Sequence, residues 1–246
     1  VADASDSCST GELDWSSNST TDWDSDGCLD SAEDTDDDND GVSDDSDDCA
    51  TGDLGWTSGS ATDYDTDGCQ DSNEDTDDDD DGVADASDSC STGELDWSSD
   101  STTDWDSDGC LDSAEDADDD NDGLTDLSDD CPTGDLNWTS NSTTDHDSDG
   151  CRDDGSEDND DDNDTVLDAN DLCARGALNW ISNSTTDADG DGCRDIDEDF
   201  DSDNDGVDDE YDSCPNGNMW WSSNSTTDYD SDGCQDSNED SDDDND

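Results

Sequence analysis

The stretch Thr21–Asp34, TDWDSDGCLDSAED, decides how this chain folds. Positions 1, 3, 5, 6, 9 and 12 of a twelve-residue loop are held by Asp22, Asp24, Asp26, Gly27, Asp30 and Glu33. Calcium takes six to eight hard oxygen ligands, which alternating carboxylates, a carbonyl at position 7 and a last acid supply around a turn that glycine permits. The spacing is that of an EF-hand loop, but Cys28 stands at position 7 and no helical pattern flanks it. The stretch therefore predicts a calcium loop that is anchored by something other than helices.

The composition favours cations as partners. The chain has 86 acidic residues against three basic ones, Arg152, Arg175 and Arg194, and a net charge of −83. Nucleic acids and anionic membranes are themselves polyanions, so the charge argues against both as partners. Only 23% of the residues are hydrophobic, which alone would indicate a disordered chain. The 12 cysteines and nine tryptophans argue for an ordered one.

The chain repeats one unit of 41 residues with two cysteines in each copy, and the fourth copy carries one inserted residue. A self-similar period of this length predicts a tandem array in which neighbouring units stabilise one another. Because the chain starts inside a repeat, we expect it to be a window on a longer array. The expected divisions are 1–7 (the end of a preceding repeat), then repeats at 8–48, 49–89, 90–130, 131–172, 173–213 and 214–246, the last of them truncated.

Each repeat holds two acidic loops. The first loops carry the predicted ligands Asp22, Asp24, Asp26, Cys28 (through its carbonyl), Asp30 and Glu33; Asp63, Asp65, Asp67, Asp71 and Glu74; Asp104, Asp106, Asp108, Asp112 and Glu115; Asp145, Asp147, Asp149, Asp153 and Glu157; Asp187, Asp189, Asp191, Asp195 and Glu198; and Asp228, Asp230, Asp232, Asp236 and Glu239. The second loops carry Asp36, Asp38, Asp40, Asp44 and Asp47; Asp77, Asp79, Asp81, Asp85 and Asp88; Asp118, Asp120, Asp122, Asp126 and Asp129; Asp160, Asp162, Asp164, Asp168 and Asp171; Asp201, Asp203, Asp205, Asp209 and Asp212; and Asp242, Asp244 and Asp246 of the cut copy, with Asp3 and Asp6 as the tail of an earlier one. All-oxygen ligation suits calcium and disfavours transition metals. One ion per loop would neutralise only 24 of the 83 net negative charges, so we expect one or more calcium ions per loop.

The repeat is too poor in apolar residues to fold on its own core. Its main apolar groups are one leucine or methionine, one tryptophan at seven residues after the first cysteine, and one valine or leucine. Such a unit needs disulfides, metals or its neighbours for stability. We therefore predict an irregular, disulfide- and calcium-stabilised tandem-repeat array with little regular secondary structure, and at most a very short strand at the Leu-x-Trp segment.

The evenly spaced cysteines predict a disulfide framework in an oxidising compartment. They can pair across the tryptophan segment or across the second acidic loop. We favour the first alternative, because calcium already organises the second loop. The favoured bonds are Cys8–Cys28, Cys49–Cys69, Cys90–Cys110, Cys131–Cys151, Cys173–Cys193 and Cys214–Cys234.

Three further positions recur at a fixed place in the repeat. The tryptophan at seven residues after the first cysteine is expected to pack on the disulfide as core. Position 2 of the first loop changes from copy to copy, which predicts a partly exposed surface where His146 is solvated and not catalytic. Glycosylation sequons at one repeat position predict N-glycans at Asn18, Asn141, Asn183 and Asn224.

Two consecutive stretches, DDDNDGVSDDSDDC (Asp36–Cys49) and DYDTDGC (Asp63–Cys69), resemble thrombospondin type 3 repeats. The resemblance covers all six units and implies calcium ions lining a chain of little regular structure. It also implies disulfides between successive cysteines, in agreement with the favoured pairing. The chain departs from that family in the cysteine at loop position 7, a longer tryptophan segment and a glutamate at position 12.

Together these patterns predict an extracellular or cell-surface, secreted structural protein, such as a stalk, surface fibre or adhesive filament, that calcium rigidifies. Its expected partners are calcium ions, neighbouring repeats or copies of itself, and covalent glycans, without membrane insertion. No nucleophile–base pair is evident, so we expect no enzymatic activity. Two alternatives stay open: an acidic calcium buffer or mineral-nucleating polyanion, and a glycan-binding module that uses the tryptophan segment.

Overall fold

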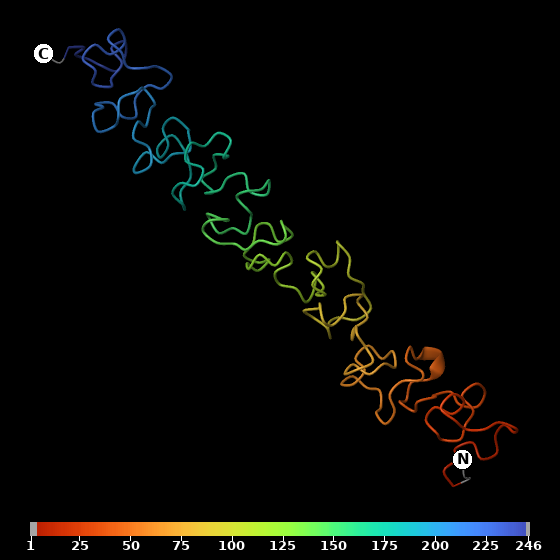
Figure 1. The fold of residues 1–246 in the computed structure, drawn as a ribbon. Coiled ribbons are helices and arrows are strands. Elements are labelled where there is room, and N and C mark those ends of the chain that lie inside the picture. Colours follow the sequence, from red (N-terminus) through yellow and green to blue (C-terminus); the bar gives the residue numbers. More distant parts are fainter. Residues whose placement is uncertain (1–3, 245–246) are drawn as a thin grey trace. The chain divides into compact units, whose positions relative to one another are not determined.

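The chain folds almost entirely into turns and loops. The structure, a computed structural model, describes residues 4–244. Within that range the one regular element is η1, a single 3-10 turn at Asp44–Ser46, which Figure 1 draws as a short coil. Residues 4–244 contain no strand, and six disulfides recur at regular intervals. The prediction of an irregular, disulfide-stabilised repeat array is confirmed.

The acidic loops are irregular because their side chains hydrogen-bond to their own backbone. The amide of Asp26 donates to Asp24 Oδ1 at 2.9 Å, and the amide of Cys28 donates to Asp26 Oδ1 at 2.8 Å. Such local bonds offer the backbone an alternative to helix or sheet. Gly27 has φ 97°, a left-handed conformation that glycine adopts without strain. The amide of Asp30 donates to the carbonyl of Thr21 at 3.3 Å and closes the loop.

The expected strand at the Leu-x-Trp segment does not form. The residue between leucine and tryptophan has a left-handed backbone, with φ 69° at Asp14 and 87° at Gly55. A strand requires extended backbone with negative φ at each residue. The leucine accordingly turns outward, and Leu13 is 84% exposed.

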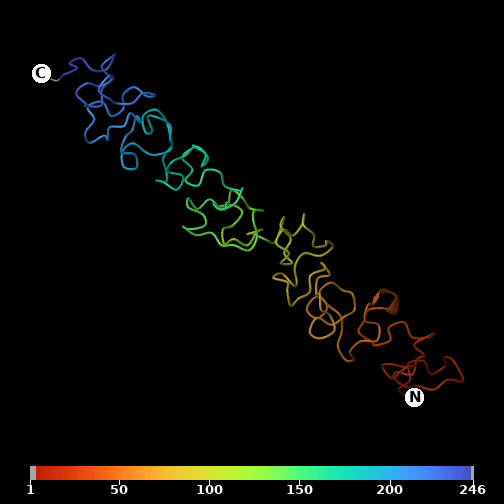
Figure 2. The same cartoon turned by 45° about the horizontal axis from the view of Figure 1, so that its top comes forward.

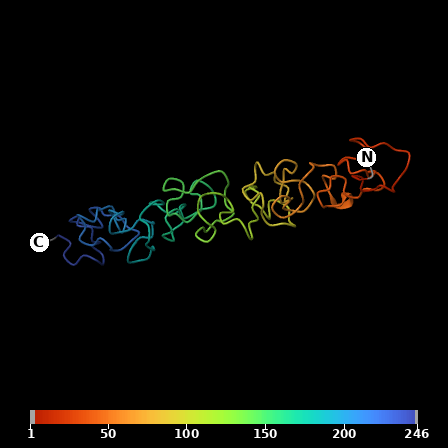
Figure 3. The same ribbon diagram turned by 90° about the horizontal axis from the view of Figure 1, so that it is seen from below.

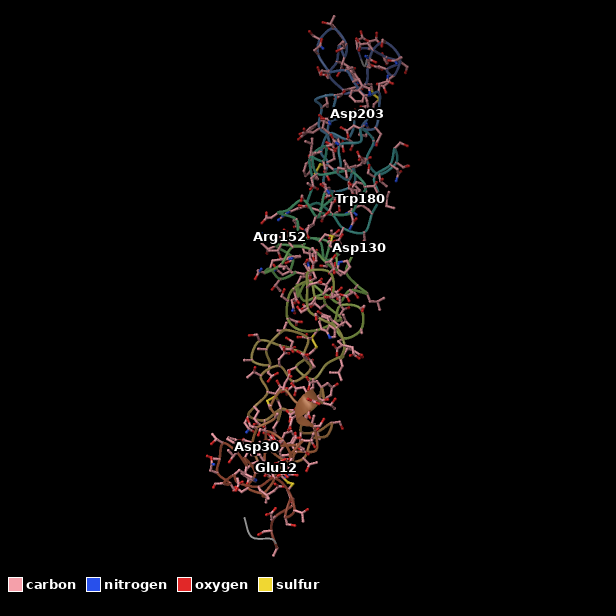
Figure 4. All side chains as sticks on the ribbon, turned by 90° about the vertical axis from the view of Figure 1, so that its right-hand side faces the viewer. Glu12, Asp30, Asp130, Arg152, Trp180 and Asp203 are labelled. Carbon is pink, nitrogen blue, oxygen red and sulfur yellow. A yellow bond between two sulfur atoms is a disulfide. The ribbon has the colours of Figure 1, made fainter. Side chains whose placement is uncertain are left out.

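The disulfides form the small apolar core of each repeat. They join the first and second cysteine of each pair: Cys8–Cys28, Cys49–Cys69, Cys90–Cys110, Cys131–Cys151, Cys173–Cys193 and Cys214–Cys234. These are the bonds that the sequence analysis favoured over pairing across the second loop. Among the described residues, the buried apolar side chains are the second cysteines of the pairs, which are 5–6% exposed. Figure 4 shows the sulfur bridges in yellow among side chains that mostly end in oxygen.

Contacts divide the chain into two units, Val1–Asp119 and Asp120–Asp246. The boundary falls inside the third expected repeat, so the units do not correspond to whole repeats. Figures 2 and 3 show that each unit is built in the same way, as a succession of loops without layers of helices or sheets.

Within a unit, the second loop of one repeat packs against the first loop of the next. Beside the Cys49–Cys69 bond, the amide of Asp48 donates to the carbonyl of Asp67 at 2.8 Å. The amide of Ser58 donates to the carbonyl of Asp40, also at 2.8 Å. These bonds hold two acidic loops together even though their charges repel each other.

Candidate metal centres

The second loop gathers its carboxylates around one point. Asp36, Asp38 and Asp40 each place an oxygen within 4.8 Å of the others. Asp38 is 2% exposed and Asp40 is fully buried. Single oxygens of Asp36, Asp40 and Asp47 are shielded from solvent and accept no hydrogen bond. A buried carboxylate without a partner is strongly unfavourable, so this arrangement fits a bound cation.

The position-12 aspartate of the second loop joins this cluster. Burial, together with repulsion from Asp38, Asp40 and Asp36, raises the pKa of Asp47 to about 6, against a hydrogen bond from the amide of Cys49. The repulsion is that of an acid close to positions 1, 3 and 5. Positions 1, 3, 5 and 12 of the predicted ligand set therefore lie together in this loop.

The first loop gathers positions 1, 3 and 5 in the same way. Oxygens of Asp22, Asp24 and Asp26 lie within 4.8 Å of one another, as do those of Asp63, Asp65 and Asp67 in the next repeat. Asp22 and Asp63 are fully buried, and each has one oxygen that accepts no hydrogen bond. These clusters can hold metal ions.

The acid that completes the first loop is at position 13, which the sequence analysis missed. Asp34 places an oxygen within 4.8 Å of Asp26 and Cys28. Burial, together with repulsion from Asp67, Asp75 and Asp63, raises the pKa of Asp65 to about 7, against a hydrogen bond from the amide of Asp67. Asp75 is the equivalent of Asp34. The signal was present in the sequence, because every repeat has an equivalent aspartate, shifted by one residue in the fourth repeat by its insertion: Asp34, Asp75, Asp116, Asp158, Asp199 and Asp240.

The position-12 glutamate points toward the tryptophan segment instead. Glu33 accepts a hydrogen bond from the amide of Glu12, and Glu74 accepts one from the amide of Asp53. In the last repeat the amide of Asn218 donates to Glu239 at 2.5 Å. The glutamate therefore connects its loop to the chain just after the first cysteine of the same repeat, and its second oxygen remains a candidate ligand.

Glycine three residues after the first cysteine makes room for this glutamate. A Cβ on Gly52 would lie 2.6 Å from Glu74 Oε1 and 3.0 Å from Asp38 Oδ2. The amide of Gly52 also donates to Asp38 Oδ2 at 2.9 Å. Glu74 thus lies beside the second-loop cluster of the preceding repeat, and one glycine brings the two carboxylates together.

The aspartate at position 9 closes each loop through a hydrogen bond to its side chain. Asp30 Oδ1 accepts the amide of Trp23 at 3.2 Å, and Asp44 Oδ1 accepts the amide of Asp37 at 2.8 Å. This bond joins position 9 to position 2 and leaves one oxygen of each carboxylate available to a cation. The predicted ligand role of position 9 is compatible with this geometry.

Position 2 of the first loop contributes a ring donor that reaches the next repeat. Trp23 Nε1 donates to the carbonyl of Gly52 at 2.9 Å, and the Tyr64 hydroxyl donates to that of Gly93 at 2.8 Å. His146 Nε2 lies 3.0 Å from the carbonyl of Gly176. His146 is partly exposed, as expected for this position, and its ring also contacts the next repeat, which the sequence did not indicate. The residues differ in type but share a polar atom at the far end of the ring.

The tryptophans of the Leu-x-Trp segment are half-buried rather than enclosed. Trp15 Nε1 donates to the carbonyl of Glu12 at 3.1 Å, and the Arg194 guanidinium lies 6.0 Å from the ring centroid of Trp180. A repeat with so few apolar side chains cannot surround an indole, which leaves these rings partly exposed.

The sequon asparagines lie on exposed turns. Asn18 Nδ2 donates to the carbonyl of Ser16 at 2.9 Å, and the amide of Thr20 donates to Asn18 Oδ1 at 3.2 Å. Asn141, Asn183 and Asn224 form the same turn. Their exposure is compatible with the predicted glycans.

The pattern of buried, unpartnered oxygens recurs along the described chain. It is found at Asp22, Asp36, Asp40, Asp47, Asp63, Asp77, Asp81, Asp88, Asp122, Asp160, Asp164, Asp171, Asp203, Asp205 and Asp212. At the N-terminal end Asp6 lies against Gly27, as Asp47 lies against Gly68. Asp242 and Asp244 are exposed, while the predicted ligands Asp3 and Asp246 lie outside the described residues.

Comparison of the chain with protein-family models and with curated proteins finds no match. Within residues 4–244, no helix has the length and apolar character needed to cross a membrane. The resemblance to thrombospondin type 3 repeats therefore remains a prediction, while acidic clusters at regular spacing and regular disulfides are features that the structure contains.

Proposed function

We propose that this chain is an extracellular calcium-binding structural repeat, part of a stalk, surface fibre or filament, in which calcium and disulfides together supply rigidity. The observation that carries the proposal is the recurrence of buried carboxylate oxygens that accept no hydrogen bond. An isolated buried carboxylate costs several kcal/mol, and a divalent cation offsets that cost at each cluster.

The ligand chemistry favours calcium over other metals. The clusters offer carboxylate and carbonyl oxygens on flexible loops, which suit the six to eight ligands and variable geometry of calcium. Magnesium requires near-octahedral geometry and keeps several waters, so it should bind more weakly. Disulfides at this density are typical of oxidising compartments, which supports an extracellular location.

The binding of many calcium ions along the chain supports a role in structural rigidity best. The metal-free chain, at a net charge of −83, repels itself strongly. Ions that bind only the folded state shift the equilibrium toward it. We also propose glycans on the exposed sequon turns, association with neighbouring repeats or further copies of the chain, and no catalytic role.

The first prediction is that calcium orders the chain in a saturable way. Calcium added to the metal-free, disulfide-intact protein should change tryptophan fluorescence and near-ultraviolet circular dichroism and produce a melting transition, with a smaller response to magnesium. Asp40→Asn should lose binding at one loop, because Asp40 is fully buried there. Asp45→Asn is the matched control, since Asp45 is exposed on η1.

Unchanged spectra after removal of calcium would rule out the proposed function. Graded, salt-sensitive binding without a melting transition would instead favour an acidic calcium buffer. Equal effects of the two variants would mean that the buried clusters are not the binding sites.

A further inference from the structure

A cluster of carboxylates lies at the junction between the first and second loop of a repeat, where it shares acids with the first loop. In the first repeat it consists of Asp30, Asp34 and Asp37, whose oxygens lie within 4.8 Å of one another. We call this set the junction cluster. Asp37 stands at position 2 of the second loop, outside the 1-3-5-12 ligand set. One oxygen of Asp34 and one of Asp37 are shielded from solvent and accept no hydrogen bond.

The same cluster in the fourth repeat holds a cation that belongs to the protein. The guanidinium of Arg175 lies between the equivalents of Asp30 and Asp37. Its Nη2 atom is 2.9 Å from Asp153 Oδ2, and its Nε donates to Asp161 Oδ2 at 3.0 Å. A third bond, from Nη1 to the carbonyl of Thr143 at 3.3 Å, fixes the plane of the guanidinium.

Burial around Arg175 shows that the cluster is an enclosed site. Asp153 and Asp158 are 9% exposed and Asp161 is 6% exposed. Asp158 is the equivalent of Asp34, and its Oδ2 accepts no hydrogen bond even with Arg175 in place. Removing the guanidinium would leave several carboxylates buried together without a counter-charge.

Arg175 is an exception in the sequence. The corresponding residue two positions after the first cysteine is neutral in the other repeats: Thr10, Thr51, Thr92, Thr133 and Asn216. The fifth repeat lowers the negative charge of its junction in another way. There Ser202 replaces the position-2 aspartate, is fully buried, and donates to Asp209 Oδ2 at 2.8 Å.

The first two repeats keep the full set of acids and have no arginine. Asp30, Asp34 and Asp37 of the first repeat are each partly buried. In the second repeat one oxygen of Asp75 and one of Asp78 are likewise shielded from solvent and accept no hydrogen bond. These junctions carry the same carboxylates as the Arg175 site but lack a protein cation.

We propose that the junction clusters of the first two repeats each bind an additional hard divalent cation, calcium by preference, at the place that the Arg175 guanidinium occupies in the fourth repeat. The ligands in the first repeat are Asp30, Asp34 and Asp37, and those in the second are Asp71, Asp75 and Asp78. This inference rests on the proposed calcium-binding function and concerns an ion in addition to one per loop, held by Asp37 together with two acids that border the first-loop site.

The test counts ions on the full-length, disulfide-bonded protein by native mass spectrometry at saturating calcium. Arg175→Thr introduces the residue of the other repeats and should gain about one calcium ion, since the freed carboxylates then match those of the first repeat. Asp37→Ser copies the fifth repeat and should lose about one ion. Arg194→Thr is the matched control, because Arg194 pairs with Asp197 on the surface at 2.7 Å and its loss should leave the count unchanged.

The outcomes separate this inference from the proposed function. An unchanged count in Arg175→Thr, or an equal gain in Arg194→Thr, would overturn the junction site while leaving the loop sites intact. Absence of specific calcium in the unmodified protein would overturn the proposed function itself. The mass of the intact protein reports whether each variant keeps its six disulfides, so a misfolded variant is recognised.

Discussion

The two loops of a repeat share one motif but are connected differently. In the second loop Asp47 at position 12 lies near positions 1, 3 and 5 of its own loop, and Asp38 accepts the amide of Gly52 in the following repeat. In the first loop Glu33 at position 12 accepts the amide of Glu12, 21 residues earlier in the same repeat, and Asp34 at position 13 lies beside the cluster. The position-12 acid of the first loop is thus tied to its own repeat, while the second loop is also tied to the next one.

Position 2 also differs between the loops. In the first loop of the first, second and fourth repeats it carries a ring whose polar end reaches a glycine carbonyl in the following repeat, as Tyr64 reaches Gly93, whereas the fifth repeat has Ala188 there. In the second loop it carries an acid such as Asp37, which belongs to the junction cluster of its own repeat. We infer that both loops connect repeats, the first through the position-2 ring and the second through its hydrogen bonds to the following repeat.

The largest expected effect involves both loops, through pH. The pKa values of Asp47 and Asp65 are raised from 3.8 to about 6 and about 7, first by burial and then by neighbouring carboxylates. A carboxyl group that holds its proton more tightly when folded favours folding at low pH and loses that contribution as the pH rises through its folded pKa. The metal-free chain should therefore become more ordered as the pH falls from about 7 to about 4.

The calcium-loaded chain should respond in the opposite direction, because cations bind ionised carboxylates and protons compete with them. Thermal unfolding of both forms, followed by tryptophan fluorescence across this pH range, measures the two slopes. Slopes of the same sign in both forms would show that the clustered carboxylates do not govern stability. A difference between repeats would show which loop type dominates.

Most of the fold was predictable from the sequence, since the cysteine period, the acidic spacing and the lack of apolar residues each exclude regular layers. The position-13 aspartate could also have been found, because it recurs in every repeat. The direction of Glu33 could not, since it depends on an amide 21 residues away that no local pattern identifies. The role of His146 was hidden because tryptophan, tyrosine and histidine share only a polar ring atom.

A smaller effect is expected from Gly52→Ala, which tests the connection made by the first loop. The added Cβ would lie 2.6 Å from Glu74 Oε1, 2.8 Å from the carbonyl oxygen of Cys49 and 3.0 Å from Asp38 Oδ2, so the carboxylates and the turn after Cys49 must shift. We expect a loss of about 1–3 kcal/mol in stability at saturating calcium, as for other overpacked sites. Denaturant unfolding with intact disulfides measures it.

Gly59→Ala is the matched control in the same repeat, because no atom lies within 4 Å of a Cβ built there. Its effect should stay within about 0.5 kcal/mol, as for most surface substitutions. If both alanine variants proved equally stable, Glu74 and Asp38 would not need the space that Gly52 provides.

The smallest effect is expected from Tyr64→Phe, which removes only the hydroxyl that joins the first loop of the second repeat to Gly93 in the third. Loss of one partly buried hydrogen bond costs about 1 kcal/mol. Faster amide hydrogen exchange should therefore appear around Gly93, with little change at the second loop of the same repeat. Tyr211→Phe provides the control, since Tyr211 is 69% exposed and its ring hydroxyl forms no hydrogen bond to the described residues. Exchange that rises equally in both loops would contradict this role of the ring, because the ring would then stabilise the repeat as a whole rather than its connection to the next.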